Sequence, residues 1–453
     1  MTSTLASHPH PSGARTARQR PCLARRLRLW AIATGLICAQ STWAFSQDPQ
    51  PLSLQQAEQA ALQNHPEIQA ARYTSLAADQ VVRETRSAYF PTVFGSVTGA
   101  EAASASRIAA GGLNNPIIYD RFASGITVGQ LVTDFGRTRA LSASSSANAQ
   151  AQSQNLSNER ANVLLDVDRA YFDVLRSQAV QRVAQDTVDA RQIVVDQVTA
   201  LAASNLKSGL DVSFARVNLA TAQLLLVQAR NDTARALAML ATTLGAPQPA
   251  PYVLSDEPLP AAPPADSKAL VVQALRERPD VQAARFKAEA ASRFADAEGD
   301  LFLPSVVAVG AFGVTPYHQV GIEDRYSAVG INVNIPIANG NLFAARHAEA
   351  TLEAQAVGQR LRSLENQVSR DVQVAWLDAS TAYQRLDLTN QLLEQASLAL
   401  DLAQSRYDLG LSSIVELSQA QLNKTEAELE QASAKYEYQI EAARLLFATG
   451  ARK

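Results

Sequence analysis

The stretch Ala61-Leu-Gln-Asn-His-Pro-Glu-Ile-Gln-Ala-Ala-Arg-Tyr73 returns later in the chain as Ala274-Leu-Arg-Glu-Arg-Pro-Asp-Val-Gln-Ala-Ala-Arg-Phe286, 213 residues further on. From Ile126, which falls on Ile331, the offset becomes 205 and keeps that value as far as Gly450. Chance similarity would not keep register over about 120 residues, so the sequence predicts a tandem structural repeat.

Residues 1–44 have the features of a secretory signal peptide rather than of a domain. Six arginines precede an apolar run over residues 29–39, and the small residue Ala44 ends the segment. This order predicts cleavage after Ala44 and export from the cytoplasm. Two alternatives stay open for the segment, a twin-arginine signal at Arg25-Arg26 and a lipid anchor at Cys38.

Charge and residue content exclude several kinds of function. Without residues 1–44, 34 basic and 43 acidic side chains remain, so we expect no nucleic-acid partner, because phosphate binding needs a basic surface. Both cysteines lie in the removed segment, which excludes disulfides and cysteine–zinc sites. The remaining histidines, His65, His318 and His347, are far apart, and no phosphate-binding glycine loop or nucleophile turn is present. We therefore expect no catalytic residue, no metal and no cofactor.

Two segments lack helix-breaking residues over an unusual length. Residues 137–208 contain neither glycine nor proline, and residues 341–409 contain only Gly358. A helix over 137–203 would be about 100 Å long. Apolar residues seven apart, such as Val415 and Leu422, predict that such helices pack side by side. An ordinary bundle core would explain the spacing but not the length. Since no run of 18 apolar residues follows the N-terminus, we expect no membrane-spanning helix.

Four short segments alternate apolar with small or polar residues, which predicts strands over Val93–Ala103, Arg121–Val132, Ser305–Thr315 and Arg325–Ile337. Segments of about ten residues suit strands that cross a bilayer obliquely, but a soluble sheet with one solvated face has the same pattern. Four strands cannot close a channel, and lipid tolerates no open sheet edge. Either the sheet is soluble, or several chains share one barrel; three chains would supply about twelve strands.

These features divide the chain into four parts. The signal peptide, 1–44, precedes a first repeat, 45–245, with a helix, a β-hairpin over 93–132 and a long helix pair that turns near residue 205. Seven prolines in residues 246–266 predict an extended linker, because such a run forms neither a helix nor a central strand. The second repeat, 267–453, has a β-hairpin over 305–337 and a turn near residue 410.

At this point the sequence resembles the TolC family of bacterial outer membrane efflux proteins, over nearly all of residues 52–453. The resemblance rests on several motifs that are weak alone but specific in this order: Pro66 and Pro279 in Leu-x-x-x-Pro-x-x-x-Ala-Ala-Arg settings, Phe90-Pro91, Leu303-Pro304, Arg406-Tyr-Asp-Leu-Gly-Leu-Ser-Ser413 and Leu446-Phe-Ala-Thr-Gly450.

Membership would imply a mainly α-helical chain with a membrane β-barrel. Four strands per chain would contribute to a shared twelve-stranded barrel, and the long helices would form a periplasmic α-barrel tunnel. The protein would be a homotrimer in outer membrane lipid that extends into the periplasm. There it would bind a periplasmic adaptor and give passive exit to cargo driven by an inner membrane pump, in tripartite efflux or type I secretion. A periplasmic helical-hairpin adaptor is the alternative function, and a diffusion porin would need many more strands. The sequence names neither the cargo nor the pump class.

The turns of the helix pairs are the candidate functional residues. Asn205 and Gly410 suit the left-handed conformation that ends a helix. The resemblance implies adaptor-contacting tips at Asn205, Leu206, Ser208, Gly410, Leu411 and Ser413, and a pore constriction at Glu416, Gln419, Asp211 and Tyr407. Carboxylates there would form rings that select cations in a trimer. The resemblance also implies that Tyr407 matches a family tyrosine that ties neighbouring hairpins together, here toward Asp211, while Ser412 stands where some members have Arg. Plain interhelical turns and solvated carboxylates are the alternatives.

Overall fold

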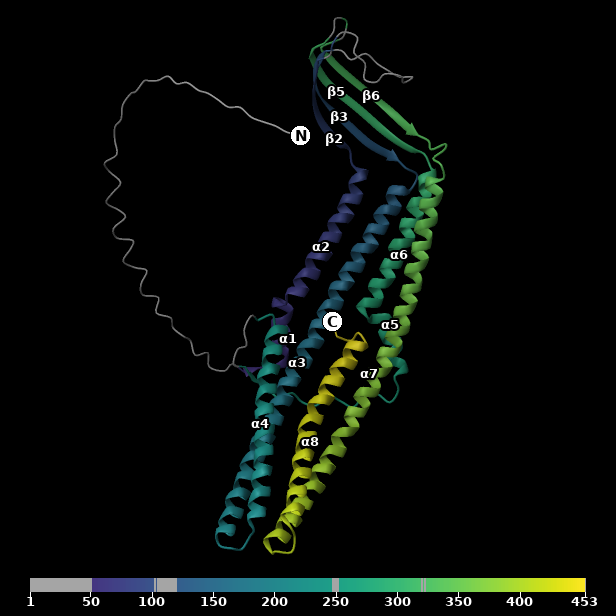
Figure 1. Ribbon diagram of the computed structural model, residues 1–453. Coiled ribbons are helices and arrows are strands. Elements are labelled where there is room, and N and C mark those ends of the chain that lie inside the picture. Colours follow the sequence, from purple (N-terminus) through teal and green to yellow (C-terminus); the bar gives the residue numbers. More distant parts are fainter. Residues whose placement is uncertain are drawn as a thin grey trace, which may run out of the picture. The chain divides into compact units, whose positions relative to one another are not determined.

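The computed structural model describes residues 51–101, 103, 120–246, 252–318, 321 and 323–452 (Figure 1). The predicted signal peptide, with Cys22 and Cys38, lies outside the described residues.

The two halves of the chain contain the same elements in the same order. The first half has α1 (Leu54–Asn64), α2 (Pro66–Arg86), β2 (Thr92–Ala100), β3 (Arg121–Thr133), α3 (Arg137–Ala203) and α4 (Gly209–Thr243). The second half has α5 (Lys268–Glu277), α6 (Pro279–Gly299), β5 (Ser305–Tyr317), β6 (Arg325–Asn334), α7 (Leu342–Asp408) and α8 (Ile414–Ala448). A 3₁₀ turn follows α2 at Ser87–Tyr89 and α6 at Asp300–Phe302.

Matching helices in the two halves have equal lengths. Both α3 and α7 contain 67 residues, and both α4 and α8 contain 35. Each of the two longer helices, α3 and α7, is therefore about 100 Å long. The predicted long helices are confirmed, and α3 has the residues that the glycine- and proline-free run indicated.

Prolines and glycines set the helix boundaries in both halves. Pro66 and Pro279 occupy the first turn of α2 and α6, where a missing N–H costs no hydrogen bond. Gly245 and Gly450, at φ +72° and +73°, end the C-terminal turns of α4 and α8. A Cβ added to Gly245 would lie 2.9 Å from the Asn64 carbonyl oxygen, so the α1–α2 junction packs directly against this turn.

The long strands form one antiparallel sheet in the order β2-β3-β5-β6, so β3 and β5 join the two halves. Three predicted strand ends are corrected. β2 ends at Ala100 rather than residue 103, because β3 begins opposite it at Arg121. β5 continues past Thr315 to Tyr317, since the Thr315 amide donates to the Asp324 carbonyl at 2.7 Å. β6 ends at Asn334 rather than Ile337, because Pro336 cannot donate to a ladder and restricts the residue before it.

The register of the strands confirms the predicted apolar and small faces. Directly paired residues share a face, so one face collects Val93, Val97, Ile126, Val128, Phe312, Val329, Ile331 and Val333. The opposite face carries mainly glycine, alanine, serine, threonine and asparagine. On that face the Tyr326 ring lies across Gly125 and Gly313, where any Cβ would clash with it.

The long helices form a layer whose order follows that of the strands. Near the sheet, α3 packs against α2 and α6, and α6 packs against α7; near the turns, α3 packs against α4 and α8, and α8 packs against α7 (Figure 1). The order is thus α2-α3-α6-α7 near the sheet and α4-α3-α8-α7 near the turns. Within the described chain, α2 and α4 lie at one edge of this layer and α7 lies at the other.

Helix α4 bears on the expectation that no helix spans a membrane. Among the described helices it is the one that is long and apolar enough, by length and composition, to cross a membrane. Asn218 and Gln223 interrupt its apolar runs, yet the mean hydropathy of an 18-residue window stays high because alanine and leucine dominate between them. Only 17% of the window is buried, since α4 is an edge helix.

The linker between the halves is held by the helices it crosses. Its Val253–Leu254 pair forms a short strand, β4, parallel to β1 at Pro51–Leu52. The hydroxyl of Tyr171, which is fully buried, lies 2.8 Å from the carbonyl oxygens of both Leu52 and Ser255 and shares its single proton between them. On α7, the indole of Trp376 donates to the Pro264 carbonyl at 2.8 Å. These bonds satisfy backbone groups that an extended segment cannot pair internally.

Candidate functional site at the hairpin turns

Both helix pairs turn through the same backbone motif, at the ends of the layer farthest from the sheet (Figure 1). Asn205 adopts φ +58° and Gly410 adopts φ +74°, the left-handed conformation expected at both positions. The next amide returns to the helix: Leu206 N–H donates to the Leu201 carbonyl at 2.9 Å, and Leu411 N–H donates to that of Arg406 at 2.8 Å. These two hydrogen bonds close the C-terminal ends of α3 and α7, and they leave the side chains of Leu206 and Leu411 pointing outward.

The outward side chains are two leucines. Leu206 is 69% exposed and Leu411 is 68% exposed, so each turn presents an apolar side chain to its surroundings. Burial of such a side chain is worth roughly 1.5–3 kcal/mol, which makes an exposed pair at matched positions a candidate contact surface.

Serine caps begin the returning helices, but the acidic residues that follow behave differently. In the first turn the Ser208 hydroxyl accepts the Asp211 N–H at 3.2 Å, and the Asp211 carboxylate accepts the Ser208 N–H at 2.9 Å. This is a closed capping box. In the second turn Ser413 accepts the Glu416 N–H at 3.4 Å, but the Glu416 carboxylate pairs with Arg406 Nε at 3.1 Å.

Tyr407 lies in an apolar cluster between the hairpins and is 4% exposed. The cluster contains Val198, Ala403, Ile414, Leu417 and Ala420. Its hydroxyl has no hydrogen-bond partner in the described chain, and the Asp211 carboxylate that we expected it to reach is occupied by Ser208. Burial, and then the charges of Asp211 and Asp408, raise the pKa of Tyr407, so the phenol is neutral at physiological pH.

Gln419 lies one helical turn beyond Glu416, on the exposed side of α8, and its amide donates to Asn423 at 2.8 Å. Between the two hairpins, the Asn218 amide donates to the Ser418 hydroxyl at 2.8 Å.

The structure therefore gathers all the candidate residues of both turns at one end of the helical layer. Which of them narrow a pore depends on neighbouring chains and stays a prediction.

Two residues that the sequence did not single out complete this site. Arg406 neutralises Glu416 across the second turn, and Lys207 places its ammonium 3.7 Å from the centroid of the Tyr407 ring. Arg406 precedes Tyr407 directly in the quoted motif, so a search for oppositely charged residues on both sides of the Gly410 turn would have found it. Lys207 acts on the other hairpin, and no local spacing indicates that contact.

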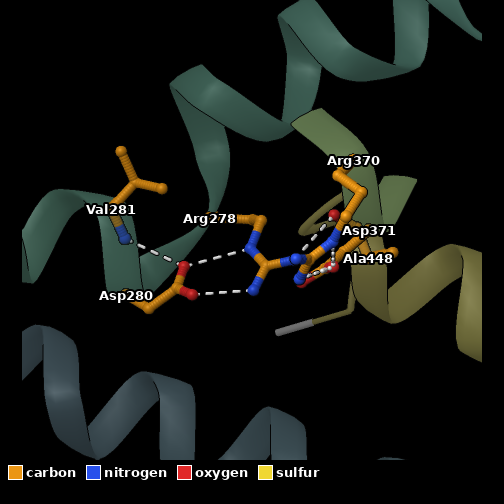
Figure 2. Close-up of polar contacts among 6 residues, drawn as sticks. All are labelled: Arg278, Asp280, Val281, Arg370, Asp371 and Ala448. Carbon is orange, nitrogen blue, oxygen red and sulfur yellow. Dashed lines mark hydrogen bonds and ion pairs between the residues drawn. The ribbon is translucent and has the colours of Figure 1, made fainter. Parts of the chain in front are cut away.

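Two buried arginine networks lie midway along the helices, one within the second half and one between the two halves. Arg278, at the α5–α6 junction, makes two bonds to the Asp280 carboxylate and donates to the Ala448 carbonyl at the end of α8 at 3.3 Å (Figure 2). Arg452, which follows α8 in the second half, joins the two halves by pairing with Glu58 and with the fully buried Asp168 of the first half, the latter at 2.6 Å. Burial and the nearby Glu58 raise the pKa of Asp168 to about 8, although Arg452 opposes that shift.

Among the described residues, no group of three or more histidine, aspartate or glutamate side chains could hold a metal ion. His65 instead caps α2 by accepting the Glu67 N–H at 3.4 Å, and His318 contacts Asp324 at 2.8 Å.

Comparison with known proteins agrees with this architecture. The sequence profile described as "Outer membrane efflux protein" matches residues 57–246 and 270–451. TolC of Escherichia coli is 23% identical over 419 residues, which cover 89% of this chain and 83% of TolC. CyaE of Bordetella pertussis is 26% identical over 387 residues, covering 82% and 78% of the two chains. The open-state MtrE outer membrane channel of Neisseria gonorrhoeae has a similar fold, with a TM-score of 0.74 at 21% identity over 88% of each chain.

Fold and matches together define a class, that of bacterial outer membrane channels built from two repeats of a β-hairpin and a long helical hairpin. The chain belongs to the outer membrane efflux protein family, as its motifs predicted, and its place in the cell is the outer membrane.

Proposed function

We propose that three copies of this chain form one channel that gives cargo passive exit across the periplasm and the outer membrane. The observation that carries this proposal is that the sheet and the helical layer of one chain both end in open, apolar edges. β2 and β6 each have one partner strand, so each leaves a row of N–H and C=O groups without a ladder partner in the single chain. Such an edge is not tolerated in lipid, and a closed barrel removes it.

The helical edges repeat this argument outside the membrane. On α4, Leu210, Val217 and Leu224 lie seven residues apart and are 65%, 62% and 72% exposed. On α7, at the opposite edge, Leu388, Leu392 and Leu402 are 61%, 50% and 67% exposed. Since these two edges differ, contact between them is heterologous and closes into a ring when the rotation fits. Three chains bring twelve strands to such a ring, a number within the range of known outer membrane barrels.

The helical hairpins would then surround the inner part of the channel, with Leu206 and Leu411 at its free end. We infer that these leucines, with Asn205, Ser208, Gly410 and Ser413, meet a periplasmic adaptor that connects the channel to an inner membrane pump. The name of one relative supports an efflux assembly: it is a toluene efflux pump outer membrane protein of Pseudomonas putida, 24% identical over 63% of this chain. Residues 1–44 would be removed as a signal peptide, and Asp211, Tyr407, Glu416 and Gln419 would line the inner entrance.

Native mass and conductance test the proposal. Purified from membranes in detergent, the protein should have the mass of a trimer, and in a planar bilayer it should conduct with a preference for cations. The Leu224→Glu variant should lose the trimer while keeping its helical circular dichroism, because a carboxylate would be buried in the inter-chain contact. Gln223→Glu, an exposed neighbour on the same helix, is the matched control and should assemble normally. A protein that stays monomeric in detergent and does not conduct would contradict the proposal.

A further inference from the structure

A cavity of about 720 Å³ opens between α3 and α4, where the α1–α2 junction meets the end of α4. This volume lies within the range of about 300–1,000 Å³ that is usual for small-molecule sites. The walls belong to one chain, with His65 at the junction, Asp173 on α3 and Met239 on α4. On α3, Asp173 lies about 160° around the helix from Tyr171, which binds the linker, so the linker leaves the cavity open.

The second half has the same backbone at the equivalent place but larger side chains. The glycine turns that end α4 and α8 pack against the α1–α2 and α5–α6 junctions in the same way. Arg278 of the second half corresponds to His65, and Phe447 corresponds to Thr242. The first half therefore has the smaller side chain at both positions.

Arg278 shows which chemical group suits this place. Its guanidinium makes two bonds to the Asp280 carboxylate, at 3.0 and 2.7 Å, and donates to the Ala448 carbonyl at 3.3 Å (Figure 2). The guanidinium carbon lies 5.7 Å from the centroid of the Phe447 ring. A carboxylate, a carbonyl at the negative end of a helix and an aromatic ring thus surround one cation.

The first half keeps the acceptors of that cation but has no arginine between them. Glu67 corresponds to Asp280, and within the described chain its carboxylate has no hydrogen bond or ion pair. His65 directs Nδ1 to the Glu67 N–H at 3.4 Å, so this nitrogen carries no proton and the ring is neutral. Thr243 corresponds to Ala448 and is the last residue of α4, where the helix dipole places partial negative charge on the carbonyl.

The charges around the whole cavity leave one negative charge over. Four carboxylates and three guanidinium groups line it. Two of the guanidinium groups pair with the aspartate three residues before them, at 2.8 and 3.2 Å. Burial raises the pKa of Asp166, and the charge of the third arginine, Arg169, opposes that rise. The carboxylate of Glu67 is the one that remains without a compensating cation.

Apolar side chains supply the rest of the surface that a ligand would meet. They are Ala170, Val180, Ala229, Ala236 and Met239. Methionine adapts its shape to different partners, because its side chain is unbranched and polarisable. A ligand that fits this lining has one positive charge and an apolar body.

We propose that the cavity between α3 and α4 binds amphipathic organic cations. The charged group of the ligand lies between the Glu67 carboxylate and the Thr243 carbonyl, and its apolar body lies against Met239. The ligand thus takes the place that Arg278 fills in the second half. This inference goes beyond the proposed function, since the site lies within one chain and needs no conducting pore.

Fluorescence polarisation of rhodamine 6G, an aromatic monocation, measures the binding. The full-length protein is held in lipid nanodiscs, and empty nanodiscs give the background. We expect saturable binding to the parent protein. Glu67→Gln should weaken it roughly fivefold, the effect of one partly screened ion pair. Glu84→Gln removes an exposed carboxylate from the same helix, α2, and is the matched control, which should bind like the parent.

Two further variants fill the cavity with the side chains of the second half. His65→Arg should reduce binding to background, because its guanidinium would occupy the place of the ligand's charge. Met239→Arg, at an exposed position that corresponds to Arg444, should also lower binding and leaves the α1–α2 junction unchanged. Circular dichroism of each variant checks that it is folded.

Three outcomes would overturn the inference. The parent protein could give no more polarisation than empty nanodiscs; Glu67→Gln and His65→Arg could bind as tightly as the parent; or the anionic dye fluorescein could bind as well as rhodamine 6G. Failure of the proposed function is visible separately, because a chain that neither forms trimers nor conducts still has this cavity and still binds the dye.

Discussion

Ser208 and Ser413 occupy equivalent positions in the two halves and have the same backbone conformation, with φ −86° in both and ψ 157° and 159°. The acidic residue three positions later nevertheless goes to different partners. Asp211 is short and returns to the amide of its own cap, whereas Glu416 is one methylene longer and pairs with Arg406. The same backbone motif therefore has two electrostatic outcomes. Asp211 caps the helix that it begins, whereas Glu416 forms an ion pair across the turn with Arg406.

The halves differ in the same way midway along the helices. Asp168 is fully buried in the first half, while the equivalent position in the second half is Gln373, which is exposed. Two halves with the same backbone therefore place charged side chains in different surroundings. Each of these differences can be tested by replacing one side chain.

The largest effect should come from the feature that both tips share. Replacing Leu206 and Leu411 together by Asp should reduce export to background without preventing trimer assembly, because two charges would replace the apolar contact surface. The measurement is retention of a fluorescent efflux dye in cells that rely on this channel, with Ser204→Asp as the control at an exposed polar position. Retained export would reduce the tips to simple turns. Unequal losses in the two single variants would show which tip contributes more.

The second-largest effect should be a pH dependence of stability, which Asp168 causes in the first half and Gln373 cannot cause in the second. The raised pKa of Asp168 means that the folded protein holds a proton which the unfolded chain releases near pH 3.8. Stability from this group is therefore fully present below pH 3.8 and declines as pH rises through about 8. At about 1.4 kcal/mol per unit the loss amounts to a few kcal/mol.

Thermal unfolding between pH 5 and 9 measures this decline. Asp168→Asn should flatten the pH dependence, because an amide does not titrate. Asp173→Asn, which affects a partly exposed pair with Arg176, is the control and should keep the parent slope. Identical slopes for Asp168→Asn and the parent would refute the raised pKa of Asp168.

The turns should respond differently to changes of the backbone. Gly410→Val should destabilise the protein by about 1–2 kcal/mol, since a β-branched residue is strained at φ +74°. An added Cβ would meet nothing within 4 Å, so the cost is purely conformational. Asn205→Gly should change stability by only a few tenths of a kcal/mol, roughly, because both residues tolerate the left-handed region. Comparable melting temperatures for Gly410→Val and the parent would contradict this account.

The acidic residues of the two tips should give the smallest changes in stability. Asp211→Ala should lose about 1 kcal/mol with its capping box, whereas Glu416→Ala should lose less, because its partner Arg406 is 56% exposed. Glu416→Ala should instead alter cation conductance or block in a bilayer, and an unchanged trace would remove Glu416 from the entrance. Glu416→Asp should be more stable than Glu416→Ala, since the shorter acid can close a box with Ser413.

Several elements could be predicted from local sequence because their causes are local. Absence of glycine and proline over residues 137–208 predicted α3, and period-two alternation predicted the four long strands and their two faces. The left-handed turn residues Asn205 and Gly410 were also predicted, since few residue types accept that conformation.

Contacts between the hairpins could not be predicted in the same way. The expected contact between Tyr407 and Asp211 is replaced by Lys207 on the Tyr407 ring, because the carboxylate finds a nearer donor in its own cap. The high average hydropathy of α4 also escaped a search for unbroken apolar runs, although it matters at the edge of the helical layer.

By itself, the sequence determined the duplication, the lengths of the helices, the alternation of the strands and the family, because each follows from residue types at short or regular spacing. Tertiary structure alone decided which polar and charged side chains meet their partners, namely Arg406 with Glu416, Arg452 with Asp168 and Lys207 with the Tyr407 ring. Side chains that are distant in sequence or separated by a turn choose partners by distance and burial, and these exist only once the helices lie side by side.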